Sequence, residues 1–81
     1  MFIFSSEIFS GVINMNRQEF EKKVAEVLVN NEDQTFRVYT KGAEIIAETY
    51  EIDMGSDNIV YLRHCNWIIA IVNISDITDI R

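Results

Sequence analysis

The stretch from Trp67 to Val72 constrains the fold of this chain more than any other. Every residue in it is apolar, so a β-strand formed there presents apolar side chains on both of its faces. Ile74, Ile77 and Ile80 follow at a spacing of three, which fits a single 3₁₀ turn leading into a short final segment. The pattern predicts a strand that faces the core on one side and the helix or another subunit on the other.

Self-association is the simplest way to cover so much apolar surface. The chain has 81 residues, of which 48% are hydrophobic, and its single cysteine rules out an internal disulfide. A domain of this size has few other sources of stability, so we expect a homo-oligomer. We expect one of Ile68 and Ile69 to lie inside the monomer and the other at the contact. The candidate contact residues are Trp67, Ile68, Ile69 and Ile71.

The charge of the chain is acidic, with 13 acidic and 7 basic residues and a net charge of −6. This balance disfavours binding to nucleic-acid backbones, which depends on clustered lysine and arginine. Several acids gather around one predicted strand, where they either keep a strand face soluble or form a docking face for a basic protein partner. The candidate acidic face comprises Glu44, Glu48, Glu51 and Asp53.

The sequence also bears on cellular location. One cysteine indicates a reducing compartment. No stretch approaches the roughly 18 apolar residues of a membrane-spanning helix, and residues 1–14 lack the basic start of a secretory signal. We therefore expect a cytoplasmic protein that does not contact a membrane.

Residues 1–14 allow three interpretations. They form a flexible leader, they add a β-strand to the fold, or Met15 is the biological start of the protein. Residues 15–81 are expected to form a single α+β domain, and a chain that begins at Met15 is expected to fold.

A helix is strongly indicated after Met15. Asn16 and Glu19 have the spacing of a capping box, and Met15 and Phe20 occupy the two positions of a hydrophobic staple. An apolar stripe at helical period follows, and two asparagines at positions 30 and 31 end it. The stripe comprises Phe20, Val24, Val27 and Leu28.

The rest of the chain is patterned as strands. In residues 35–40, Phe36 and Val38 share one face. A tight turn follows, in which Gly42 is expected to supply a positive φ. The apolar positions of residues 43–54 change phase near Glu48, so this strand must bend or carry a bulge there. Further strands are expected over residues 59–64 and from Trp67 onward.

Together these patterns predict an α+β fold. An N-terminal amphipathic helix precedes a strongly bent antiparallel meander of four to five strands. A bend of this kind is how small barrels turn a corner between two sheets, so we expect a small-barrel-like arrangement.

The sequence resembles the Sm-like family and, more broadly, the Src-homology-type small β-barrels. The segment "KGAEIIAETYEID", with Gly42, Ile45 and Asp53, is similar to the first Sm motif. The segment "LRHCNWIIAI" is similar to the second, where Arg63 and Asn66 match.

The resemblance implies a small barrel that binds RNA. Arg63 and Asn66 would then contact the nucleic acid, and replacing both by alanine should abolish binding with little change in melting temperature. The sequence departs from the family pattern at Ala47 and His64, which replace glycines, and at Cys65, which replaces an aspartate.

No set of residues indicates catalysis. His64 and Cys65 are adjacent, and neighbouring residues of a strand point to opposite faces, so they are not expected to form a dyad. One histidine and one cysteine also fall short of a zinc site. We expect no enzymatic activity, no metal and no cofactor. The preferred interpretation is a self-associating protein–protein interaction module, and the alternative is an Sm-like RNA-binding protein.

Overall fold

The computed structural model describes residues 15–81. Helix α2 (Arg17–Asn30) is followed by strands β1 (Phe36–Thr40), β2 (Ala43–Ala47), β3 (Thr49–Ile52), β4 (Ile59–His64) and β5 (Trp67–Asn73). The 3₁₀ turn η2 (Ile74–Asp76) leads into β6 (Ile77–Ile80). The predictions made for residues 1–14 lie outside the described residues.

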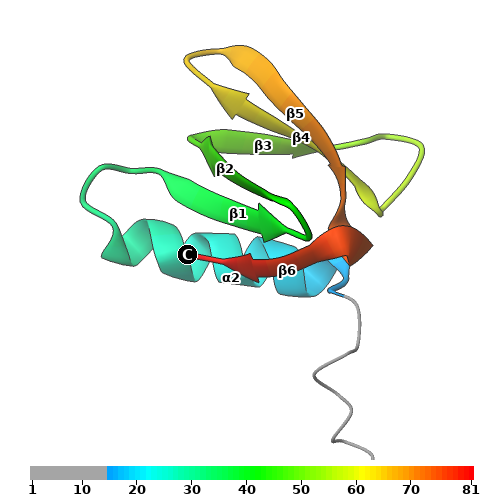
Figure 1. The fold of residues 1–81 in the computed structure, drawn as a ribbon, viewed down its shortest axis with the longest axis horizontal. Coiled ribbons are helices and arrows are strands. Elements are labelled where there is room, and N and C mark those ends of the chain that lie inside the picture. The colour runs from blue at the N-terminus through cyan, green and yellow to red at the C-terminus, as the bar shows by residue number, and fades with distance from the viewer. Residues whose placement is uncertain (1–14) are drawn as a thin grey trace, which may run out of the picture.

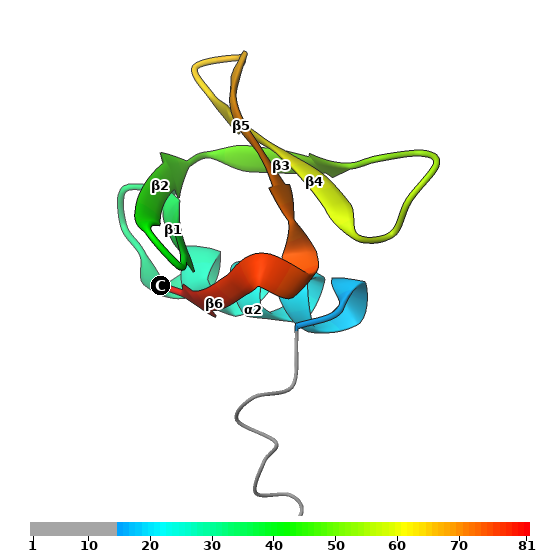
Figure 2. The same ribbon diagram turned by 45° about the vertical axis from the view of Figure 1, so that its right-hand side comes forward.

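The strands form two antiparallel sheets of three, in the orders β2-β1-β6 and β3-β4-β5. Helix α2 lies along β1 and β6, and the tip of the β4–β5 hairpin lies farthest from it (Figure 1, Figure 2). The α+β prediction is confirmed. Among residues 15–81 neither sheet closes on itself.

The helix begins and ends where the sequence predicts. The side chain of Asn16 accepts a hydrogen bond from the backbone N–H of Glu19 at 2.9 Å, and the Glu19 carboxylate accepts one from the N–H of Asn16 at 3.0 Å. The predicted apolar stripe faces the core, where Phe20 and Val24 are fully buried. The capping box and the amphipathic helix are therefore confirmed.

The predicted bend divides one long strand into two. Strand β2 ends at Ala47 and β3 begins at Thr49, so only Glu48 separates them. The side chains of Ala47 and Tyr50 both reach the core. In one continuous strand these two positions would point to opposite faces, so the break at Glu48 lets both face inward. We predicted four to five strands, and the structure has six among the described residues, because the long strand is divided and β6 is added.

One core serves both sheets and the helix. Its buried side chains come from α2, β1, β2, β4, η2 and β6: Phe20, Val24, Phe36, Val38, Ala47, Val60, Leu62, Ile74, Ile77 and Ile80. Strand β6 pairs with β1, so Ile80 lies opposite Val38. The predicted 3₁₀ turn buries Ile74 and turns the chain from the second sheet back to the first.

The turn chemistry differs from the prediction. Thr40 and Ala43 pair across the β1–β2 turn, but Gly42 does not adopt a positive φ, so that prediction is wrong. Among the described residues, positive values occur at Gln34 before β1 (φ 61°) and in the β4–β5 turn, at Cys65 (φ 55°) and Asn66 (φ 70°). His64 pairs with Trp67 across these two residues, which is the geometry of the mirror-image turn that favours tight hairpins.

Candidate interaction surface

Strand β5 is an edge strand. It pairs with β4 on one side, and no other strand of residues 15–81 pairs with it on the other. An edge of this kind presents backbone N–H and C=O groups that can accept a further strand. The ends of the two sheets are formed by β2, β6, β3 and β5.

A bulge determines which β5 side chains reach the core. Leu62 pairs with Ala70 and Arg63 with Ile68, so Ile69 is an extra residue without a partner on β4. The extra residue shifts the alternation of faces along the strand. As a result, the small side chain of Ala70 lies on the core side.

The large apolar side chains of β5 are exposed to solvent. We expected one of Ile68 and Ile69 inside the monomer, and this is wrong because the bulge leaves both about half exposed. Only Ala70 and Val72 of this strand pack against the core. The exposed fractions are 75% for Trp67, 49% for Ile68, 46% for Ile69 and 65% for Ile71.

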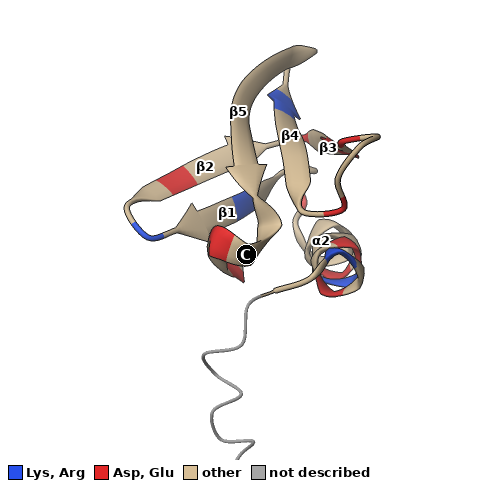
Figure 3. Ribbon diagram, turned by 90° about the vertical axis from the view of Figure 1, so that its right-hand side faces the viewer, with Lys and Arg blue, Asp and Glu red and all other residues tan. Residues whose placement is uncertain are grey.

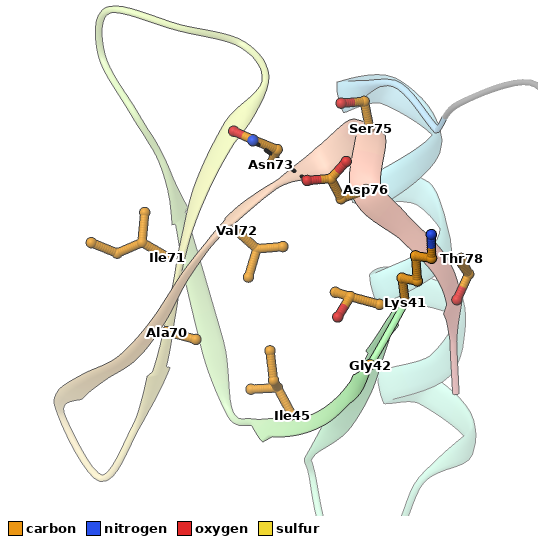
Figure 4. A pocket seen from close by; sticks show the side chains of 11 residues that line it. Lys41, Gly42, Ile45, Ala70, Ile71, Val72, Asn73, Ser75, Asp76 and Thr78 are labelled. Atoms are coloured by element: carbon orange, nitrogen blue, oxygen red, sulfur yellow. Dashed lines mark hydrogen bonds between the residues drawn. The ribbon is translucent and has the colours of Figure 1, made fainter.

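Strand β5 also borders a groove between the two sheets (Figure 4). One wall comes from β2 and the turn before it, including Lys41 and Ile45, and the other comes from β5, including Ile71 and Val72. Asn73 and Asp76 lie at the end next to η2, with the Asn73 amide donating to the Asp76 carboxylate at 3.5 Å. The apolar surface of β5 therefore continues into a concave region.

The four acids of the candidate docking face are divided between the sheets. Glu44 lies on β2, Glu48 at the bend, Glu51 on β3, and Asp53 directly after β3. Figure 3 shows acidic positions on both sheets rather than in one band.

Each of these carboxylates has a partner within the chain. Glu44 accepts a hydrogen bond from the Tyr39 hydroxyl at 3.0 Å, and Glu48 accepts one from the backbone N–H of Cys65 at 2.9 Å. The other two pairs are Glu51 with Arg63 at 3.0 Å, and Asp53 with the Tyr61 hydroxyl. The Tyr61 hydroxyl, with the backbone N–H of Gly55, lowers the pKa of Asp53 from its ordinary value.

The two candidate RNA contacts lie near the β4–β5 turn. The guanidinium of Arg63 is bound to the Glu51 carboxylate, which offsets its charge. Asn66 is exposed and has a left-handed backbone. Alanine is strained at such a position. A loss of RNA binding in the double alanine variant of Arg63 and Asn66 would therefore also reflect lost stability.

The structure brings His64 and Cys65 together with a third residue. Because Cys65 lies in the turn rather than on the strand, the alternation of faces does not separate it from His64. Ligand atoms of Glu48, His64 and Cys65 all lie within 4.8 Å of one another. The sequence argument against a dyad assumed that both residues lie on a strand, and that assumption does not hold for Cys65. The sequence pattern does not show that His64 pairs with Trp67, which leaves Cys65 in the turn.

Comparisons with protein-family models, with curated proteins and with solved structures found no match. Within residues 15–81, α2 is neither long enough nor apolar enough to span a membrane.

Proposed function

We propose that this protein is a self-associating protein–protein interaction module and that β5 forms the contact between copies. The observation that carries the proposal is the exposure of Trp67, Ile68, Ile69 and Ile71 along an unpaired strand edge. Exposed apolar side chains gathered on one element are typical of an interaction surface.

The composition of the four edge strands supports this choice. Edge strands usually carry charges that prevent further pairing. Glu44 lies on β2, Glu51 on β3 and Asp79 on β6, whereas β5 carries no charged residue (Figure 3). Among the described strands, β5 is thus the edge least protected against a new partner.

A second copy of the chain is the partner that suits this edge. The two chains each carry a net charge of −6, so contact is most favourable where charge is absent. Antiparallel pairing of β5 with β5 of another copy uses the same residues on both sides, as a two-fold contact requires. It satisfies the free backbone groups of both edges and covers the apolar side chains from water.

A single charge on the strand tests the proposal. Ile71 is 65% exposed, so Ile71→Glu should leave the monomer folded while placing like charges at the contact. Light scattering should show an oligomer for the unmodified protein and a monomer for Ile71→Glu, with equal helix content by circular dichroism. The matched control is Val29→Glu on the exposed side of α2, where the side chain is 85% exposed and association should persist. A monomeric unmodified protein at tens of micromolar would overturn the proposal.

An Sm-like RNA-binding barrel is the second candidate. It is supported by the order of elements. The helix is followed by β1 and β2, a bend at Glu48 into β3, the β4–β5 hairpin, a 3₁₀ turn, and β6 returning to β1. In this interpretation the sheets form a small barrel that is open between β2 and β5. The acidic net charge and the pairing of Arg63 with Glu51 weigh against it.

Titration with short uridine- and adenine-rich oligonucleotides separates the two candidates. The interaction module should bind neither. Micromolar binding that weakens in Arg63→Ala and falls steeply with salt would favour the RNA-binding candidate instead. Asn66→Gly is the suitable companion variant because glycine keeps the left-handed backbone of this turn.

A further inference from the structure

Three different ligand side chains meet beside the β4–β5 turn. Glu48 comes from the bend between β2 and β3, His64 from the end of β4, and Cys65 from the turn itself. Their ligand atoms lie within 4.8 Å of one another, and the Nε2 atom of His64 is 4.0 Å from Oε2 of Glu48. The cluster therefore combines a carboxylate oxygen, an imidazole nitrogen and a sulfur.

The backbone holds these residues in place. The N–H of Glu48 donates to the carbonyl oxygen of Arg63 at 2.8 Å, which joins the bend to β4. The N–H of Cys65 donates to Oε1 of Glu48 at 2.9 Å, leaving Oε2 on the side of His64. The positive φ of Cys65 turns its side chain out of the strand alternation. One carboxylate oxygen thus anchors the cluster while the other remains available.

We propose that Glu48, His64 and Cys65 bind one Zn²⁺ ion per chain. Zinc accepts oxygen, nitrogen and sulfur ligands, whereas magnesium and calcium prefer oxygen alone. With metal–ligand distances of about 2.0 to 2.3 Å, tetrahedral ligands lie about 3.3 to 3.8 Å apart. Rotation of the exposed side chains can close the remaining gap, and water completes the coordination.

Access and charge also suit a cation. The side chains of His64 and Glu48 are 39% and 44% exposed, so an ion reaches them without opening the core. Cys65 is exposed as well. A divalent ion would also reduce the net charge of −6. The proposal does not depend on self-association, since the ligands come from one chain.

Cobalt titration tests the site because thiolate coordination has its own absorption. The chain has one cysteine and one histidine, so a sulfur-to-cobalt charge-transfer band can arise only from Cys65. With the protein reduced by a phosphine, we expect this band to saturate at one Co²⁺ per chain and to disappear when Zn²⁺ is added. Zn²⁺ should also raise the melting temperature of the unmodified protein, since it binds the folded state.

Variants define the ligand set. Cys65→Ser should lose the band, and His64→Gln and Glu48→Gln should each weaken Co²⁺ binding by about tenfold or more. Glu32→Gln removes an equal charge from the exposed loop before β1 and should bind as the unmodified protein does. If Cys65→Ser does not fold, His64→Gln decides the question. Absence of the band at saturating Co²⁺, or equal affinity in the ligand variants and the control, would overturn the proposal.

Discussion

The ring of Tyr50 meets the ring of Phe20 edge-on, with centroids 4.9 Å apart and planes at 84°. Tyr50 makes a second edge-on contact with Phe36, at 6.3 Å and 86°. Phe20 belongs to α2 and Phe36 to β1, whereas Tyr50 belongs to β3. One side chain of the second sheet therefore joins the helix to the first sheet.

Removing this ring should destabilise the domain. Each edge-on pair contributes about 0.5–1.5 kcal/mol beyond buried area, so Tyr50→Leu should lower the free energy of unfolding by about 1–3 kcal/mol. Tyr50→Phe keeps both ring contacts and should cost less than about 1 kcal/mol. Urea denaturation followed by circular dichroism measures both variants. Equal losses would show that the hydroxyl, rather than the ring, supplies the stability.

The capping box gives a second prediction. Asn16→Ala leaves the backbone N–H of Glu19 without its side-chain acceptor and should cost about 1 kcal/mol of stability. The control is Gln18→Ala, an exposed position of the first helical turn that should change little. Thermal melting of the two variants should separate them clearly, and a shift of the same size in both would contradict the role of the cap.

Two turn positions should respond in opposite ways to alanine. Gly42 has no positive φ, and an added Cβ meets no heavy atom within 4 Å, so Gly42→Ala should stabilise the protein by about 0.4–1 kcal/mol. Asn66 has a φ of 70°, so Asn66→Ala should destabilise it by more than about 1 kcal/mol. Chemical denaturation of the two variants gives the sign of each effect. Stabilisation by Asn66→Ala would mean that this turn is not left-handed in solution.

The bond between Tyr61 and Asp53 predicts pH dependence at both extremes. It lowers the pKa of Asp53 and raises the pKa of Tyr61. The stability from Asp53 is present above its unfolded pKa of about 3.9 and is lost as pH falls through the lower folded pKa. The stability from Tyr61 is present below its unfolded pKa of about 10 and is lost as pH rises through the higher folded pKa.

Tyr61→Phe should therefore flatten both limbs of a plot of melting temperature against pH. In the variant, Asp53 keeps only its backbone donors, so a smaller acid-side dependence remains. Adding Asp53→Asn to Tyr61→Phe should remove most of that remainder. An unchanged alkaline limb in Tyr61→Phe would show that the bond does not persist in solution.

The sequence predicts the features of this fold that depend on neighbouring residues. The cap at Asn16, the bend at Glu48 and the 3₁₀ turn at Ile74 each follow from a local change of pattern, and each is observed. A helix cap or a break in alternation is determined within a few residues, so a short window contains the necessary information.

The features that the sequence did not predict depend on pairing between distant residues. The bulge at Ile69 leaves no trace in an unbroken apolar run, because every register there gives an apolar face. The exposure of Ile68 and Ile69 follows from that bulge. The grouping of Glu48 with His64 and Cys65 depends on which strands lie side by side. A left-handed turn at Cys65 and Asn66 could have been predicted from asparagine, which tolerates this backbone.

The single residue between β2 and β3 also governs how the domain can open. Glu48 joins strands of different sheets, and its N–H is bonded to Arg63 of β4. The two sheets also share one core, so separating them would expose side chains that are packed against both. The two sheets should therefore form one cooperative unit, and the slowest-exchanging amide hydrogens of β1 and β4 should share the same free energy of opening.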